Sequence, residues 1–177
     1  MLQDVVSVSL PVNERMRIKK NHFEPYNLTG KEKRICIVTG IHGDELEGQY
    51  VCYELIRRLG ENGHLLNGIV DIYPSMNPLG MDSIKREMPI FDLDMNMIFP
   101  GSETGAVAEH IAAAIMNDIK GADICIDIHA SNIFLREMLM YGREAQSKTR
   151  IASPATIPKS GERNRKIHSC MLYLISI

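Results

Sequence analysis

The chain has 177 residues, of which 45% are hydrophobic and 24% charged, a composition typical of one globular domain with its own core. Its formal net charge is −2 and its six histidines are scattered, so it has no basic stripe for binding nucleic acid. The first residues lack the pattern of a secretory signal, and no apolar run approaches the ~20 residues that a membrane span needs. We therefore expect a domain that binds neither nucleic acid nor membranes.

The cysteines show no C-x-x-C spacing, and three of the four lie inside apolar runs. This is typical of buried thiols in a reducing compartment. We therefore expect a cytoplasmic protein in which the cysteines are packing residues. These are Cys36, Cys52, Cys125 and Cys170.

The first elements along the chain are extended. Residues 5–11 and 14–20 alternate polar and apolar side chains, which predicts a β-hairpin or a pair of edge strands. Residues 34–39 form a short apolar run that predicts a buried strand. Apolar residues then recur at helical spacing over 45–59, and Gly60 supplies a stop signal.

A second buried strand is predicted at 68–74, followed by a turn-rich segment at 77–80. A long irregular connection runs from there to about Thr104, and ordered loops of that length are usually functional. An amphipathic helix is predicted at 104–119 with Thr104 as a candidate N-cap, and a third buried strand at 123–128. Strands that alternate with helices predict an α/β sandwich with a mixed, largely parallel central sheet.

The sharpest feature is Gly40-Ile41-His42-Gly43-Asp44-Glu45, where the first buried strand ends and a helix begins. His42 and Glu45 are three residues apart and can point to the same side. His129, at the end of the third strand, opens toward the same crevice, since α/β sheets bind ligands beyond the carboxyl ends of their strands. Two imidazoles and one carboxylate leave an open position on Zn²⁺, as in catalytic sites. Taken alone, His-x-x-Glu is a weak signal, because His42 could also cap a helix.

Three further elements lie between these motifs: Asn77-Pro78, Arg86 and the run Asp-Leu-Asp-Met-Asn-Met-Ile-Phe-Pro-Gly at 92–101. With this ordered set, residues 5–139 resemble the succinylglutamate desuccinylase/aspartoacylase family of the zinc carboxypeptidase superfamily. The resemblance implies a three-layer α/β/α sandwich with one Zn²⁺ per chain. It also implies hydrolysis of an amide or ester bond in an N-acyl amino acid or similar small acyl substrate.

The resemblance also assigns roles to individual residues. The implied zinc ligands are His42, Glu45 and His129. Asp94 would orient the ring of His42, which fixes its tautomer. Arg86 would polarise the substrate carbonyl and stabilise the developing oxyanion, and Asn96 would help to bind the substrate carboxylate.

Some of these residues also have plainer interpretations. Asp94 and Asn96 could be ordinary turn formers, and Arg86 could be a solvated loop charge. Asp127, two residues before His129 and so on the same strand face, could support the site or be a satisfied polar residue at a strand end. We leave Asp127 out of the catalytic set.

The remaining histidines have no partner pattern, and we interpret them as surface or helix-face residues: His22, His64, His110 and His168. Thioethers suit copper rather than zinc, so we interpret the methionines of the long connection as adaptable packing. These are Met76, Met81, Met88, Met95 and Met97.

Two departures from the family pattern stand out. The residue after Asn96 is Met97, where the family has an arginine that grips the substrate carboxylate, so we expect weaker recognition of a carboxylate. The family's general-base glutamate lies on a late strand, and we expect the chain to end before it. Its loss would slow proton transfer by a factor of about 10² to 10⁴. Three acidic residues follow Asp127, and none of them lies in the late-strand pattern of that glutamate: Glu137, Glu144 and Glu162.

After about residue 139 we recognise none of the family's motifs in the sequence. The segment 142–166 has no helical or strand period, whereas 171–177 is apolar and could be a short strand or a sticky terminus. We therefore expect a C-terminally truncated or divergent member, with the zinc-hydrolase catalytic domain at 1–139 and a tail of uncertain structure at 140–177. A sheet cut short would leave an open edge and exposed apolar faces, which favours either association, as in a homo-oligomer, or poor stability.

Three hypotheses follow for the function. The chain is an active zinc hydrolase, or it keeps the zinc site without turnover, or it is a structural α/β domain that holds no metal. Zinc analysis separates the third hypothesis from the others, and turnover separates the first from the second.

Overall fold

The computed structural model describes residues 1–130 and 171–175. Its strands are β1 (Leu2–Ser9), β2 (Arg15–Phe23), β3 (Arg34–Thr39), β4 (Ile69–Tyr73), β5 (Ile124–His129) and β6 (Met171–Ile175). Its α-helices are α1 (Glu47–Glu61), α2 (Pro78–Ser83) and α3 (Val107–Ile119). Short 3-10 helices lie at Pro11–Asn13, Gly63–Leu65 and Met95–Met97.

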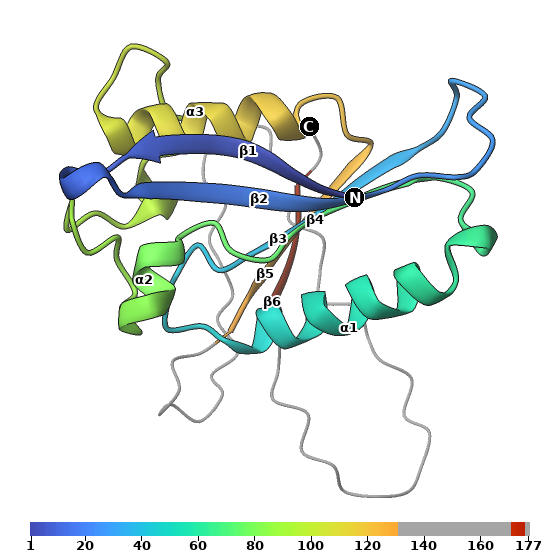
Figure 1. Ribbon diagram of the computed structural model, residues 1–177, viewed down its shortest axis with the longest axis horizontal. Helices are drawn as coiled ribbons and strands as arrows, with labels where there is room; N and C mark the ends of the chain where they lie inside the picture. Colours follow the sequence, from blue (N-terminus) through green and yellow to red (C-terminus); the bar gives the residue numbers. More distant parts are fainter. Residues whose placement is uncertain (131–170, 176–177) are drawn as a thin grey trace, which may run out of the picture.

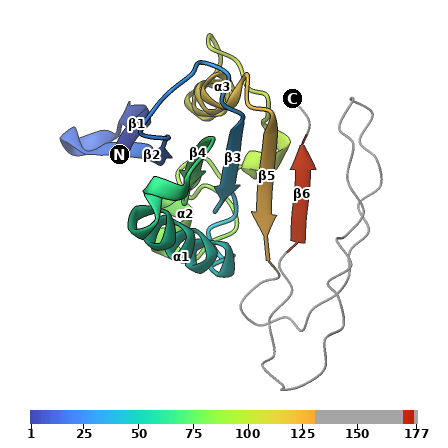
Figure 2. The ribbon, with the colours of Figure 1, turned by 90° about the vertical axis from the view of Figure 1, so that its right-hand side faces the viewer.

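The strands form one mixed sheet in the order β1-β2-β4-β3-β5-β6. The three central strands β4, β3 and β5 pair in parallel, whereas β1–β2, β2–β4 and β5–β6 pair antiparallel. Helices α1 and α3 lie on opposite faces of this sheet (Figure 1). The predicted α/β/α sandwich with a mixed sheet is therefore confirmed, with its parallel pairing confined to the centre (Figure 2).

The predicted N-terminal hairpin is confirmed as β1 and β2, and it belongs to the main sheet because β2 pairs with β4. At the other edge, the apolar segment that could be a strand or a loose terminus forms β6 over Met171–Ile175 and pairs with β5. The proposed boundary at 139 and 140 lies outside the described residues, so the two-part division stays a prediction.

The main core lies between the sheet and α3. Cys36 and Val38 alternate along β3 and so share one face, where they pack with Ile111 and Ile115 of α3. The predicted cysteine burial is confirmed at Cys36, Cys52 and Cys125, while Cys170 lies outside the described residues. The predicted packing role is confirmed for three methionines of the long connection, Met76, Met88 and Met95, which are fully buried.

Two local predictions were wrong at helix starts. Helix α3 begins at Val107 rather than Thr104, and its N-cap is Ala106, whose backbone N–H donates to the carboxylate of Glu109. The segment predicted as a turn at 77–80 is the first turn of α2. Its N-cap is Asn77, whose side-chain oxygen accepts from the backbone N–H of Gly80 at 2.9 Å.

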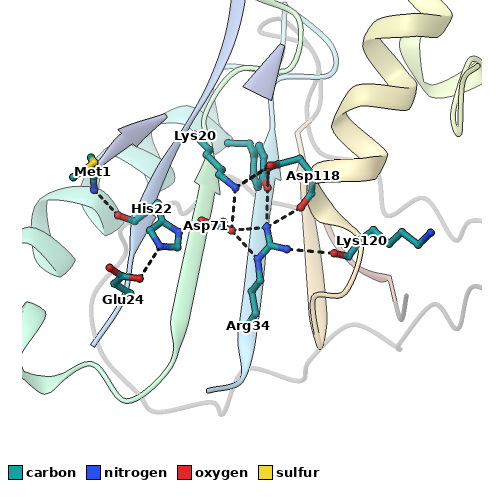
Figure 3. A network of polar contacts seen from close by, with 9 residues as sticks. Met1, Lys20, His22, Glu24, Arg34, Asp71, Asp118 and Lys120 are labelled. Atoms are coloured by element: carbon teal, nitrogen blue, oxygen red, sulfur yellow. Dashed lines mark hydrogen bonds and ion pairs between the residues drawn. The ribbon is translucent and has the colours of Figure 1, made fainter. Parts of the chain in front are cut away.

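A buried network of charges joins the hairpin, the sheet and α3 (Figure 3). Asp71 on β4, only 1% exposed, accepts hydrogen bonds from Arg34 at 2.6 and 2.8 Å, and its other oxygen lies 2.6 Å from Nδ1 of His22. Lys20 bridges Asp71 and Asp118 at 3.5 and 2.9 Å. The interpretation of His22 as a histidine without a partner was therefore wrong. His64 and His110 are exposed as expected, and His168 lies outside the described residues.

No helix among residues 1–130 is long and apolar enough to cross a membrane.

Gly48 lets α1 approach the ends of β3 and β5. A Cβ atom at this position would collide with Oγ1 of Thr39 and lie 3.3 Å from Cγ2 of Ile128, whereas a Cβ at Gly60 of the same helix would meet nothing within 4 Å. Gly48→Ala should therefore lower the free energy of unfolding by about 1 to 3 kcal/mol through overpacking. Gly60→Ala should raise it by up to about 1 kcal/mol through helix propensity. Chemical denaturation measures both, and a stabilising Gly48→Ala would contradict the close packing.

The charge network should make stability depend on pH. Burial alone would raise the pKa of Asp71, but hydrogen bonds from His22 and Arg34 and the charge of Lys20 outweigh it and lower the pKa below its ordinary 3.8. A lowered carboxylate pKa stabilises the fold above that ordinary value, and the contribution is lost as pH falls below it.

Asp71→Asn should therefore lower the free energy of unfolding by about 3 kcal/mol at about pH 7, because it leaves buried cations uncompensated. The difference from the unmodified protein should shrink at about pH 3. Urea titrations at both pH values test this, with the exposed Asp82→Asn as the control. A difference that stays constant across this range would contradict the assignment.

Candidate metal centre

The loop between β3 and α1 carries the predicted site. Gly40 has a positive φ of +71°, a conformation that side chains other than glycine rarely adopt, and it turns the chain out of β3. His42 and Glu45 follow in this turn and are 2% and 5% exposed, so both side chains point into the protein rather than into solvent.

Helix α2 supports this loop through backbone contacts. The backbone N–H of Gly43 donates to Lys85 O at 3.0 Å, and a Cβ at Gly43 would collide with the backbone of Gly80. Asn77 donates from its backbone N–H to Gly40 O at 2.8 Å and from its side chain to Ile41 O at 3.3 Å. The Asn-Pro element therefore holds the loop in place.

The structure brings the three predicted ligands together, although His129 lies on β5 and the other two follow β3. The carboxylate of Glu45 lies between the imidazoles, with Oε1 2.7 Å from Nδ1 of His42 and Oε2 3.0 Å from Nδ1 of His129. Oε2 also accepts from the backbone N–H of Ala130 at 2.9 Å. One ligand atom from each of the three side chains lies within 4.8 Å of the others.

The carboxylates around the two histidines favour a positive charge between them. Burial alone would raise the pKa of Glu45, but hydrogen bonds from His129, His42 and the backbone of Ala130 lower it to about 2. Burial alone would lower the pKa of His129, but the hydrogen bonds and charges of Asp127 and Glu45 raise it to about 10. A proton or a metal cation can supply the charge that this environment favours.

Asp94 and Asn96 lie beside the outer edge of His42. Asp94 Oδ1 is 3.2 Å from Nε2 of His42, and the side-chain nitrogen of Asn96 is 3.0 Å from the same atom. Asp94 also accepts from the backbone N–H of Asn96 at 2.9 Å and so caps the 3-10 helix Met95–Met97. The turn-forming and histidine-orienting interpretations of Asp94 are thus compatible.

Arg86 lies at the mouth of the group, and its side chain is 48% exposed. Its two terminal nitrogens lie 3.5 Å from Glu45 Oε1 and 3.4 Å from Asp94 Oδ2. A guanidinium held in this way is fixed on one side and accessible to solvent on the other. The interpretation of Arg86 as a purely solvated charge does not account for these contacts.

Asp127 is the site neighbour that the sequence analysis left out. Its Oδ2 lies 3.0 Å from Nε2 of His129, on the side of the ring opposite Glu45. The Asp-x-His spacing already placed both residues on one face of a strand, and that alternation was the signal for the contact.

The two departures from the family pattern have different outcomes. Met97 is 86% exposed at the end of the 3-10 helix beside Asn96, and its thioether side chain carries no charge. The expectation about a general base concerns Glu137, Glu144 and Glu162, which lie outside the described residues and are not tested.

The donor set fits zinc. Imidazole nitrogens and a carboxylate oxygen are preferred zinc ligands, and three protein ligands leave a position open for catalysis. The residues that would hold the ion are His42, Glu45 and His129. Each imidazole also has a carboxylate at its other nitrogen, as is usual for histidines that bind metal.

Comparison with known proteins identifies the family of this chain. The model of the succinylglutamate desuccinylase/aspartoacylase catalytic domain matches residues 31–154. The N-alpha-acetyl-L-2,4-diaminobutyric acid deacetylase of Halomonas elongata is 30% identical over 102 residues, which are 57% of this chain and 29% of that protein.

Solved structures of the same family superpose on this chain. A succinylglutamate desuccinylase/aspartoacylase from Rhodobacter sphaeroides superposes with a TM-score of 0.64 at 26% identity, over 74% of this chain and 40% of that one. An aspartoacylase family protein from Mesorhizobium loti gives 0.61 at 26% identity, over 73% and 40%. A metallo-carboxypeptidase from Burkholderia cenocepacia shares the fold, with a TM-score of 0.59 at 17% identity over 74% and 36%. The chain thus spans well under half the length of these relatives. It belongs to the succinylglutamate desuccinylase/aspartoacylase family and has its carboxypeptidase-like fold.

Proposed function

We propose that the protein is a zinc-dependent hydrolase, a deacylase that cleaves an amide or ester bond of an N-acyl amino acid or similar small acyl substrate. The observation that carries this proposal is the convergence of His42, Glu45 and His129, with ligand atoms within 4.8 Å of one another. Membership of a family that includes a deacetylase supports the reaction type.

Zinc in a site of this kind supplies a Lewis acid that polarises a carbonyl and activates water. The protein's own contribution begins with the two carboxylates behind the histidines, Asp94 and Asp127, which restrain both rings. Glu45 keeps its negative charge at neutral pH because the hydrogen bonds of both histidines hold its pKa at about 2. The ligands are therefore arranged before any substrate arrives.

Arg86 is our candidate for stabilising the oxyanion. Its contacts with Glu45 and Asp94 aim the guanidinium at the edge of the metal group, and its half-exposed side chain can be reached by a substrate. A fixed positive charge at this point would favour the tetrahedral state, in which the carbonyl oxygen gains negative charge. Arginine keeps this charge at any working pH.

Asn96 is our candidate for contacting the substrate carboxylate, because its amide lies beside the histidine group and its residue is exposed. The neighbouring side chain, Met97, has no charge to add to that contact. We therefore propose that a carboxylate is recognised weakly. The named activity of the Halomonas elongata relative makes N-acetylated amino acids the first substrates to test.

A second candidate is a zinc-binding family member without turnover. The exposed Met97 favours it, because the family resemblance implies an arginine at this position. We also propose a cytoplasmic location, which the burial of Cys36, Cys52 and Cys125 supports.

The test of the proposed function compares the unmodified protein with His42→Ala and with His110→Ala, whose histidine is exposed on α3. Zinc content and hydrolysis of a panel of N-acyl amino acids and simple esters are measured on all three. We expect about one zinc per chain and turnover in the unmodified protein and in His110→Ala, and loss of both in His42→Ala. Bound zinc without turnover would select the second candidate, and absence of zinc would overturn both.

Arg86 can be separated from the metal ligands. Arg86→Ala should leave zinc content unchanged and lower kcat by about 10² to 10³, the usual cost of losing one donor to an oxyanion. Arg57→Ala, which removes an exposed arginine paired with Glu54 and Glu61 on α1, should leave kcat unchanged. Steady-state kinetics on metal-loaded protein decide. An effect on KM alone would assign Arg86 to ground-state binding instead.

A further inference from the structure

Asparagine followed by glycine occurs twice in the chain, at Asn62-Gly63 and at Asn67-Gly68. Asparagine is a thermolabile residue, because the backbone nitrogen of the next residue can attack the carbon of its side-chain amide. Glycine has no Cβ atom to obstruct that attack. Both asparagines are exposed on the connection between α1 and β4, so neither the motif nor solvent exposure distinguishes them.

Hydrogen bonds restrain Asn62 at the end of α1. It is the C-cap of the helix, and its backbone N–H and its side-chain nitrogen both donate to Arg58 O, at 3.0 and 2.9 Å. Its own carbonyl accepts from the backbone N–H of Leu65 at 2.9 Å, next to the 3-10 helix Gly63–Leu65. The side-chain amide and the backbone of Asn62 are therefore held together, and the amide must leave Arg58 O before it can rotate.

Asn67 has none of these restraints. Among the described residues, neither its side chain nor the backbone N–H of Gly68 has a hydrogen-bond partner. Asn67 instead lines a shallow hollow of the surface together with Lys31 and Lys33. Its amide can therefore rotate toward the nitrogen of Gly68 without losing a contact with the rest of the protein.

We propose that Asn67 is a site of spontaneous deamidation in the folded protein, and that the helix cap protects Asn62 from the same reaction. The nitrogen of Gly68 forms a bond to Cγ of Asn67, the Cγ–Nδ2 bond breaks, and ammonia leaves with the proton that the N–H of Gly68 gives up. Solvent water then opens the succinimide ring at either carbonyl, which yields aspartate or isoaspartate. The reaction needs no metal and is independent of the proposed function.

The isoaspartate product alters the start of β4, because it adds a carbon atom to the main chain directly before Gly68. The next residue, Ile69, donates from its backbone N–H to Lys33 O at 2.8 Å and is paired with Arg34 of β3. A longer main chain displaces this pairing, since the register of a strand depends on the spacing of its residues. The aspartate product keeps the main chain and adds only a charge, in a hollow that two lysines line. Isoaspartate, and not aspartate, should therefore lower thermal stability.

Timed incubation of the folded protein at neutral pH, followed by tandem mass spectrometry, measures conversion at each asparagine. We expect Asn67 to convert about ten times faster than Asn62, because conversion at Asn62 must first break the hydrogen bonds of the helix cap. In protein unfolded by urea, both sites should convert at similar rates. Asn67→Gln is the control, which should abolish conversion at this position and leave the rate at Asn62 unchanged.

Equal conversion at the two sites of the folded protein, or no conversion at Asn67, would overturn the inference. A preference for Asn67 that persists unchanged in urea would also overturn it, because the local sequence and not the fold would then set the rate. Thermal unfolding of the isoaspartate-containing fraction and of Asn67→Asp tests the effect on β4. We expect a lower midpoint for the fraction alone, and equal midpoints for both and for the unmodified protein would contradict that effect.

Discussion

The carboxylate of Glu45 is the point at which two distant parts of the chain meet. Its oxygens contact His42 beside it in sequence and His129 at the end of β5, and the backbone of Ala130 donates to it as well. This is possible because β3 and β5 are adjacent and parallel, with Thr39 opposite Ile128, so both strands end at the same edge of the sheet. The site thus depends on one strand pairing and on one shared carboxylate.

The two ends of the central strands use charge differently. Beyond their carboxyl ends, polar groups are arranged around a place for a cation, and Asp127 keeps an oxygen without a partner among the described residues. Near the start of β3, Arg34 and Asp71 belong to a network that also includes Lys20 and Asp118. Paired charges at that end stabilise the contact between the sheet and α3, whereas the groups at the other end are arranged as the ligands of a metal ion would be.

Much of this arrangement could be predicted from the sequence, because it depends on short-range patterns. The Gly-x-His-Gly-x-Glu turn after an apolar run, with a histidine after another such run, predicted that His42, Glu45 and His129 lie at one edge of the sheet, and the family resemblance implied their role as ligands. Contacts set by strand register were not accessible. The partner of His22 is Asp71, which faces it only because β2 and β4 pair antiparallel in that register. Asp127 was placed on the correct face, but strand alternation alone gives no distance to Nε2 of His129.

The close packing between the loop at 40–45 and α2 decides which nearby positions can be substituted. Gly43 packs against the backbone of Gly80 and donates to Lys85 O, and the amide of Asn77 completes the contact, so the loop geometry depends on these backbone positions. The exposed side chains of Asp82 and Ser83 lie on the outside of that helix. The side chain of Asp82 can therefore vary in evolution, and a fluorescent label attached there would report on the helix that holds the loop without touching these contacts.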